Sequence, residues 1–246
     1  GPDGSIISSS YKPESDVNLN AKFTASSRAS LTLHLYVMNT DGTYPSRPET
    51  STQYGYAGND YVYSNTKKGF YVDMSKGKTD RVNVKADGSS VLDIYLARDP
   101  YIVVWYNYDG QEVLKSENYL YGSTLSHPTT PIREGYDFLG WFSTSNEKVE
   151  NNIEVKGNMS LTAKFGKGEA KVTVRLFEQD LDGNYTLAKT LTERATVDEV
   201  YTWNGTVPTG FDLNDKHPDS TLSANVKSDG TTIIEVYLQR HVYTVK

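Results

Sequence analysis

Hydrophobic and polar residues alternate along several short stretches of the chain, and this alternation is the clearest structural signal in the sequence. In the first such stretch the hydrophobic residues occupy every second position, at Leu31, Leu33, Leu35 and Val37. A period of two residues is typical of a β-strand that buries one face. The same pattern recurs at Ile94 and Leu96, at Val172, Val174 and Leu176, and at Val236 and Leu238. Helical periodicity is weak, so the pattern predicts a chain that is mainly β.

Five Asp-Gly pairs lie beside the alternating stretches, at Asp41-Gly42, Asp87-Gly88, Asp109-Gly110, Asp182-Gly183 and Asp229-Gly230. This dipeptide tolerates the positive φ of tight turns, so each pair predicts a hairpin turn. One segment favours a helix instead. Thr196-Val197-Asp198-Glu199 matches a capping box, which predicts a short helix over Thr196–Tyr201.

A large part of the sequence occurs twice. Leu31–Tyr36 corresponds to Val172–Phe177 at an offset of 141 residues, and Val84–Gly88 corresponds to Val226–Gly230 at an offset of 142. The order of the matching pieces is kept, which indicates duplication. We therefore predict two copies of one module, named module A1 (31–98) and module A2 (172–240).

A different segment, named module B (101–165), lies between the two copies. Leu19–Phe23 repeats Leu161–Phe165, so residues 6–30 are expected to hold the end of a preceding copy of module B and a linker. Residues 241–246 resemble the start of module B and are expected to begin another copy. Gly1–Ser5 resembles a remnant of cloning, and the chain is expected to be an excerpt of a longer protein.

The short linkers predict how the modules are arranged. Arg98-Asp99-Pro100 and Gly166-Lys167-Gly168 leave little chain for folding one module back on another. We therefore expect three small modules in an elongated array. Small-angle scattering checks this: a compact body of this length has a radius of gyration near ~17 Å, and an array of three modules should exceed roughly 25 Å. The compact value would contradict the prediction.

Composition and charge exclude several classes of protein. The chain contains no cysteine, which excludes disulfide scaffolds, thiol catalysis and Cys-based zinc sites. Its formal net charge is −6 without a block of Lys or Arg, so nothing supports a nucleic-acid partner. No apolar run approaches the roughly 20 residues that span a bilayer, so no membrane insertion is expected.

The sequence offers no catalytic, cofactor-binding or metal-binding constellation. None of the four histidines (His34, His127, His217, His241) recurs between the copies of module A, although a repeated active site would keep its base. Four acids of module B are interpreted as a solvated face rather than a glycosidase pair: Glu134, Asp137, Glu147 and Glu150. Asp180–Asn184 has the wrong spacing for a calcium loop and is interpreted as a turn.

Clustered aromatic residues are the candidates for ligand binding. Module A1 has Tyr54, Tyr56, Tyr61 and Tyr63, and the matching part of module A2 has Tyr201 and Trp203. Aromatic faces stack on sugars, so the proposed ligand-binding residues are Tyr61, Tyr63, Tyr201 and Trp203. The alternative is that these side chains only pack in half-buried edge strands.

Module B resembles the Listeria–Bacteroides repeat, also called the internalin B-repeat. The resemblance is carried by an aromatic strand, a Tyr-Gly, a Pro-x-x-Pro stretch, an Arg-Glu-Gly-Tyr-x-Phe-x-Gly-Trp core and a closing strand, at Tyr101–Gly110, Tyr121-Gly122, Pro128–Pro131, Arg133–Trp141 and Leu161–Phe165. It implies a β-grasp-like fold in which the first and last strands lie side by side, displayed in tandem on bacterial surface proteins.

The residues of this core also have a direct physical interpretation. Gly135 and Gly140 bracket a strand with two aromatic residues on one side, and Trp141 and Phe142 place rings on opposite faces. In a small module without disulfides such rings supply much of the core. Trp141 is therefore predicted to be a packing residue.

Module A is similar to mucin-binding-protein-like repeats through its Asp-Gly-x-Tyr opening, its central Gly-Phe and its Asp-Gly before a closing Tyr-Leu strand. Together the resemblances imply a mainly β (α+β, β-grasp-like) repeat region of a Gram-positive protein, extracellular and associated with the cell wall. The expected function is a non-catalytic stalk or spacer of an adhesin. The alternative is adhesive modules that bind host glycans such as mucin, or a host surface protein. A monomer with weak end-to-end contacts is expected.

Overall fold

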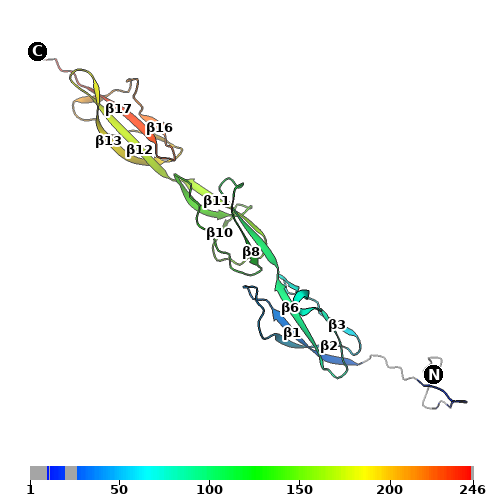
Figure 1. Cartoon of the computed structure of the whole chain (residues 1–246). Helices are drawn as coiled ribbons and strands as arrows, with labels where there is room; N and C mark the ends of the chain where they lie inside the picture. The colour runs from blue at the N-terminus through cyan, green and yellow to red at the C-terminus, as the bar shows by residue number, and fades with distance from the viewer. Residues whose placement is uncertain (1–9, 11, 20–26, 245–246) are drawn as a thin grey trace. The chain divides into compact units, whose positions relative to one another are not determined.

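The computed structural model describes residues 10, 12–19 and 27–244 (Figure 1). The described part of the chain contains seventeen strands and one four-residue helix, so the mainly β prediction is confirmed. The chain divides into two compact units. The first contains the chain up to Pro100 and also Leu120–Ser123, and the second contains Tyr101–Tyr119 and the chain from Thr124 onward.

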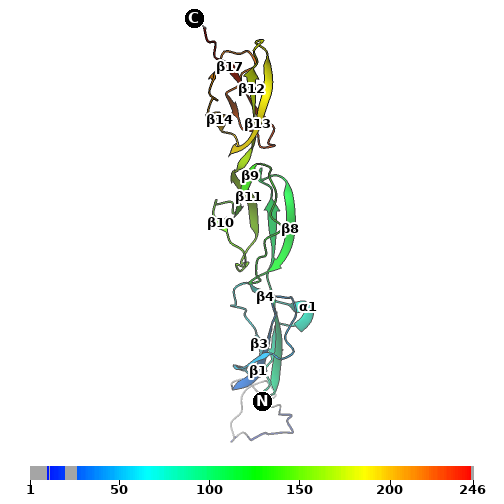
Figure 2. The ribbon, with the colours of Figure 1, turned by 90° about the vertical axis from the view of Figure 1, so that its left-hand side faces the viewer.

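The first unit is built on a four-stranded sheet with the order β2-β1-β6-β4. A separate two-stranded sheet pairs β3 with β5, and the helix α1 lies in the same unit (Figure 2). The bounds are β1 (Arg28–Val37), β2 (Glu49–Tyr56), β3 (Asp60–Val62), β4 (Phe70–Val72), α1 (Met74–Gly77), β5 (Arg81–Asn83) and β6 (Ser90–Arg98).

Alternation along β1 and β6 builds the core of this unit. Leu31 and Leu33 are buried against Leu92, Ile94 and Leu96, as the period-two pattern predicts. β1 and β6 run parallel, so the first and last strands of module A1 are neighbours.

Module B forms a five-stranded sheet with the order β10-β9-β11-β7-β8. The bounds are β7 (Pro100–Tyr106), β8 (Val113–Leu120), β9 (Tyr136–Phe142), β10 (Lys148–Val149) and β11 (Met159–Lys167). β7 and β11 are parallel neighbours, in agreement with the arrangement that the resemblance implies.

A β-bulge in β9 arranges the aromatic core of module B. Lys164 of β11 pairs with Gly140, and the next residue, Phe165, pairs with Phe138. Leu139 is therefore an extra residue, and Gly140 has φ +135°. The shift brings Phe138 and Trp141 into one cluster, although they are three residues apart. Trp141 is fully buried, which confirms its predicted packing role.

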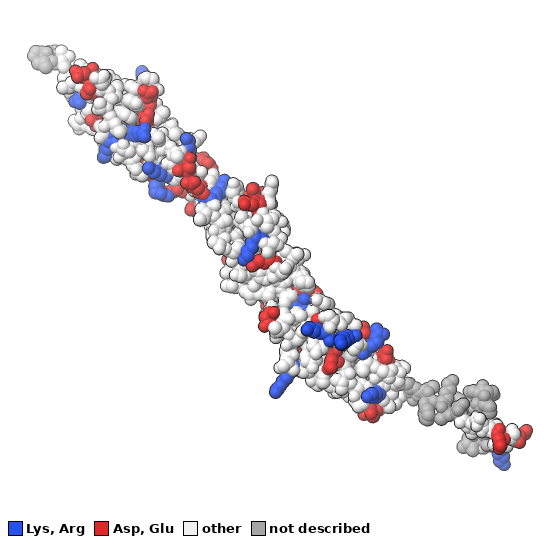
Figure 3. Space-filling model, in the orientation of Figure 1, with Lys and Arg blue, Asp and Glu red and all other residues white. Residues whose placement is uncertain are grey.

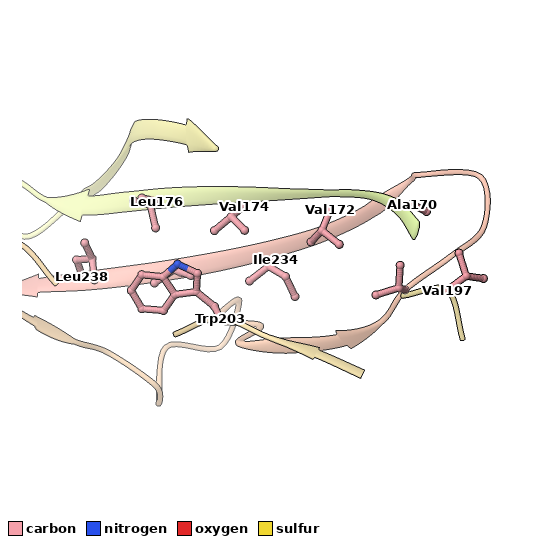
Figure 4. Packing of buried hydrophobic residues seen from close by; sticks show 10 residues of the cluster. Ala170, Val172, Val174, Leu176, Val197, Trp203, Ile234 and Leu238 are labelled. Atoms are coloured by element: carbon pink, nitrogen blue, oxygen red, sulfur yellow. The ribbon is translucent and has the colours of Figure 1, made fainter. Parts of the chain in front are cut away.

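Module A2 repeats the topology of module A1, with the sheet order β13-β12-β17-β15 and a small sheet of β14 and β16. β12 and β17 are parallel neighbours. Figure 4 shows Val172, Val174 and Leu176 of β12 beside Ile234 and Leu238 of β17. The bounds are β12 (Glu169–Gln179), β13 (Tyr185–Thr196), β14 (Val200–Thr202), β15 (Phe211–Leu213), β16 (Ser223–Asn225) and β17 (Thr232–Arg240).

The helix predicted over Thr196–Tyr201 is wrong. β13 ends at Thr196, a turn follows, and β14 begins at Val200. The side chain of Val197 is buried in the core, and Asp198 takes φ +59°, which is incompatible with a right-handed helix. The helix that does form, α1, was not predicted. Its only sequence signal is Asp73, whose carboxylate accepts a hydrogen bond from the Ser75 N–H.

Each Asp-Gly pair forms a turn, but the hairpin prediction holds for three of the five pairs, including Asp41-Gly42 between β1 and β2, and is wrong for the other two. The glycine of each pair has positive φ, between +70° and +90°. The turns at Asp109-Gly110 and Asp182-Gly183 join strands that are neighbours in one sheet. Those at Asp87-Gly88 and Asp229-Gly230 instead lead from a small sheet into a large one, so they are not hairpins. In these two the dipeptide predicts a turn but not its partners.

The predicted end strands lie partly outside the described residues. Of the expected strand at Leu19–Phe23 only Leu19 is described, and 245–246 of the expected C-terminal strand are not described. His241–Thr244 carries no strand, and the expectation that 241–246 begin another copy of module B stays a prediction. None of the helices in the described ranges is long and apolar enough to cross a membrane.

Candidate functional site

The four predicted ligand-binding residues occupy equivalent places in modules A1 and A2. Tyr61 is the middle residue of β3 and pairs with Val82, and Tyr201 is the middle residue of β14 and pairs with Ala224. Tyr63 and Trp203 follow two residues after them. The sequence comparison therefore matched the correct segments.

Burial distinguishes these four side chains. Tyr61, Tyr63 and Tyr201 are half-buried and pack against the core of their own module. Trp203 is only 8% exposed and lies among the core residues of module A2 (Figure 4).

Close backbone approach encloses the Trp203 ring. A Cβ added to Gly205 would lie 2.6 Å from the indole Nε1, so this position needs glycine. Among the described residues the indole N–H finds no hydrogen-bond partner. Trp203 is therefore a core residue whose ring is not exposed to a ligand, whereas the other three side chains are partly accessible.

The hydroxyl of Tyr201 is tied to a carboxylate. It donates a hydrogen bond to Glu193 Oε2 at 2.5 Å. Burial of the ring, followed by this hydrogen bond and the charge of Glu193, raises the pKa of Tyr201 to about 12. The phenol is therefore protonated at neutral pH and keeps the Glu193 carboxylate in place.

A polar groove of about 490 Å³ opens beside Tyr201. Glu193, Arg194, Glu199 and Thr202 line it together with Tyr201. The Arg194 guanidinium donates to the backbone oxygen of Glu169 at 2.9 Å and forms an ion pair with the Glu169 carboxylate at 3.4 Å. This mixture of hydroxyl, amide and paired charges suits a neutral, hydroxyl-rich ligand.

Module A1 presents a different surface at the equivalent place. The strand pairing puts Tyr54 at the position of Arg194 and Arg28 at the position of Glu169. Tyr54 is 58% exposed, and Tyr56 is similarly exposed on the same edge strand, β2. The Arg28 guanidinium lies 5.5 Å from the centroid of the Tyr54 ring. These two tyrosines, which were not among the four predicted residues, expose the largest aromatic faces of this stretch.

All four histidines contact other side chains, and two of these contacts bear on the comparison of the modules. His34 Nδ1 lies 2.8 Å from the Asp93 carboxylate across β1 and β6, and the matching pair in module A2 is Arg175 with Glu235 at 3.3 Å. A polar side-chain pair across these two strands is therefore present in both copies, with different residues in each. His127 packs edge-on against Trp105, and burial lowers the pKa of its imidazole.

The acidic side chains that the sequence offered as catalytic or calcium-binding candidates form a turn or face solvent. Glu134, Asp137, Glu147 and Glu150 are all exposed, in agreement with a solvated face. The Asp180 carboxylate accepts hydrogen bonds from the N–H groups of Asp182 and Asn184, which lowers the pKa of Asp180 and confirms the predicted turn. Within the described ranges, no group of three or more His, Asp or Glu residues could hold a metal ion.

Charge is distributed without a dominant patch on the visible face. In Figure 3, Lys and Arg are interspersed with Asp and Glu on each part of that face. This agrees with the modest formal net charge of −6.

Comparisons with solved structures give distant similarities. The Bacillus anthracis TIE protein is 10% identical, with 87% of this chain and 51% of that chain covered and a TM-score of 0.34. The type 2 repeat of the mucus binding protein MUB from Lactobacillus reuteri is 14% identical, with 58% and 100% covered and a TM-score of 0.17. The pilus adhesin SpaC from Lactobacillus rhamnosus GG is 10% identical, with 87% and 44% covered and a TM-score of 0.24.

The chain spans about half of the TIE protein chain that it matches. No curated protein matches the chain. One part of the chain, within module B, matches a family model. Residues 103–164 match the family model described as the Listeria-Bacteroides repeat domain.

Proposed function

We propose that this chain is a non-catalytic repeat region of a bacterial cell-surface protein, in which each module acts as a spacer that holds an adhesive part away from the cell. One observation carries the proposal. In all three modules the first and last strands are parallel neighbours: β1 with β6, β7 with β11, and β12 with β17.

Parallel terminal strands make each module add length. The first strand enters at one end of the sheet, and the last strand, running in the same direction, leaves at the other end. The eleven residues of β12 rise about 36 Å at ~3.3 Å per residue. Each added module therefore extends the chain instead of returning it to its starting point, as a spacer requires.

The same arrangement resists tension. Pulling on the ends of module A2 moves β12 and β17 in opposite directions along their common ladder, which runs from Val172↔Thr232 to Glu178↔Leu238. All hydrogen bonds of the ladder are then loaded together in shear. Pulling from the same end of both strands would instead break them one after another.

Force spectroscopy with two attachment geometries tests this proposal. Since the chain has no cysteine, pairs of introduced cysteines give unique handles. The variant with Glu169→Cys and Arg240→Cys loads the ladder in shear, and the variant with Glu169→Cys and Thr231→Cys peels it. All three positions are exposed. We expect a clearly higher unfolding force in the first geometry. Equal forces would contradict the mechanical part of the proposal.

A second candidate function is adhesive binding of a host glycan, such as mucin, or of a host surface protein. It is supported by the exposed Tyr54 and Tyr56 on β2 and by the polar groove beside Tyr201. A glycan array and a mucin pull-down with the whole chain test it. If the tyrosines bind, replacing Tyr54 and Tyr56 together by Ala should weaken binding about tenfold. Tyr71→Ala, at an exposed tyrosine of β4, is the matched control. Absence of binding by the unmodified chain leaves the spacer as the function.

A further inference from the structure

The aromatic residues of β9 belong to two different modules. Phe138 and Trp141 lie in the core cluster of module B. Tyr136, at the start of the same strand, packs instead against the core cluster of module A2. The core of module B is therefore complete without Tyr136, and this side chain requires another explanation.

Specific polar contacts hold the Tyr136 ring against module A2. Its hydroxyl donates a hydrogen bond to the Asp198 carboxylate, with an O···O distance of 2.5 Å, and this bond raises the pKa of Tyr136. On the module B side, the guanidinium carbon of Arg133 lies 3.7 Å from the centroid of the Tyr136 ring and 4.2 Å from that of Tyr108. Arg133 thus holds the Tyr136 ring through a cation–π contact on the module B side, while the hydroxyl bonds to module A2.

Backbone hydrogen bonds also connect module B to module A2 where β11 is followed by β12. Only Gly168 separates β11 from β12. The Gly168 N–H donates to the Gly135 carbonyl at 3.0 Å, and the Val197 N–H donates to the Gly168 carbonyl at 2.9 Å. A Cβ on Gly135 would lie 2.8 Å from Cα of Ser228 in module A2, and Gly135 has φ +78°. This glycine therefore also allows module A2 to approach.

The Val197-Asp198 turn, which contacts Tyr136, has a different residue from the equivalent turn of module A1 at its position of positive φ. Gly58 and Asp198 are equivalent, since the N–H of each donates to a matching carbonyl, Val84 or Val226. Gly58 takes φ +83° without strain, whereas Asp198 takes φ +59°, which is unfavourable for a residue with a Cβ. Module A2 thus has a residue in a less favourable backbone conformation at the position from which its carboxylate accepts the hydrogen bond of the Tyr136 hydroxyl.

We propose that the Gly135-Tyr136 turn of module B is a docking element for the following module, and that its contact with the Val197-Asp198 turn couples the opening of modules B and A2. The partner surface is a turn with a carboxylate acceptor in the left-handed conformation. This inference is independent of the spacer and glycan-binding functions.

Limited proteolysis at the junction tests the coupling in the whole chain. Trypsin can cleave the Lys167–Gly168 bond, and cleavage within paired strands requires local opening, so its rate reports the open population. Tyr136→Phe keeps the ring and removes the hydroxyl. We expect cleavage of this bond, identified by mass spectrometry, to become about tenfold faster, because a hydrogen bond to a charged group is lost. Tyr136→Ala should be faster still.

Two further variants make the outcome decisive. Tyr201→Phe removes a similar tyrosine–carboxylate bond inside module A2 and should leave cleavage at Lys167–Gly168 unchanged. Asp198→Gly removes the acceptor, suits the positive φ, and should accelerate cleavage as much as Tyr136→Phe. Combining Tyr136→Phe with Asp198→Gly should add nothing to either change alone. Unchanged cleavage in Tyr136→Phe, strictly additive effects, or an equal acceleration by Tyr201→Phe would overturn the proposal.

Discussion

Replacing Trp141 by Ala should unfold module B while both A modules stay folded. Trp141 is fully buried, and its ring lies 4.9 Å from that of Trp105 and 5.7 Å from that of Phe138. Truncating a buried aromatic residue costs about 3–5 kcal/mol. A module of this size has a total stability of roughly the same magnitude. Modules A1 and A2 have separate core clusters, which do not include Trp141.

Proteolysis followed by mass spectrometry measures this effect. In the Trp141→Ala variant, new cleavage sites should appear between about 101 and 165, while the A modules remain resistant. Ile132→Ala is the matched control within module B, because Ile132 is 94% exposed and its truncation removes no core contact. Resistance of the Trp141→Ala variant equal to that of the unmodified chain would show that the ring contributes little to folding.

The second large effect is expected from two consecutive isoleucines in β17. Ile234 is completely buried in the core of module A2, whereas Ile233 points to the other face of the sheet and is 42% exposed. Ile234→Ala should lower the free energy of unfolding of module A2 by about 2–5 kcal/mol, because it removes buried methyl groups and leaves a cavity. Ile233→Ala should change it by no more than about 0.5 kcal/mol.

Thermal or denaturant unfolding of the two variants provides the comparison. The pair is well matched, since the chemical change, the strand and the parallel partner strand, β12, are the same. A similar loss in both variants would mean that strand propensity, rather than burial, dominates at these positions. It would also contradict the assignment of the two faces of β17.

Proteolysis of Trp141→Ala also bears on the docking of modules B and A2. If module B unfolds, the Tyr136 contact with Asp198 is lost along with it, but the core of module A2 remains intact. We therefore expect the Lys167–Gly168 bond to be cleaved faster in this variant, and module A2 to stay folded but to open more often because its contact with Tyr136 is lost.

The amino-acid sequence by itself determined the local features of this protein. Alternation identified the buried faces of β1, β6, β12 and β17, because a period of two follows from strand geometry alone. The Asp-Gly pairs marked turns for a similar reason, since glycine is the residue that adopts positive φ without strain. The duplication placed Tyr201 and Trp203 in the part of module A2 that matches the tyrosine-rich stretch of module A1, and the strand pairing makes Tyr201 the equivalent of Tyr61. The Gly-Tyr-x-Phe-x-Gly-Trp segment was enough to indicate the Listeria-Bacteroides repeat that the family model matches at 103–164.

Tertiary structure decided the features that depend on contacts far apart in the chain. The bulge at Leu139 brings Phe138 and Trp141 together, and this depends on the register with β11. The capping-box pattern at Thr196 predicted a helix, but a turn forms instead, because it buries Val197 in a core made by strands distant in the sequence. Tyr136 belongs to the module that follows it, which no local period can indicate. A residue's immediate neighbours in sequence favour a backbone conformation, but its contacts, and at Val197 the conformation itself, depend on the packing of segments separated by tens of residues.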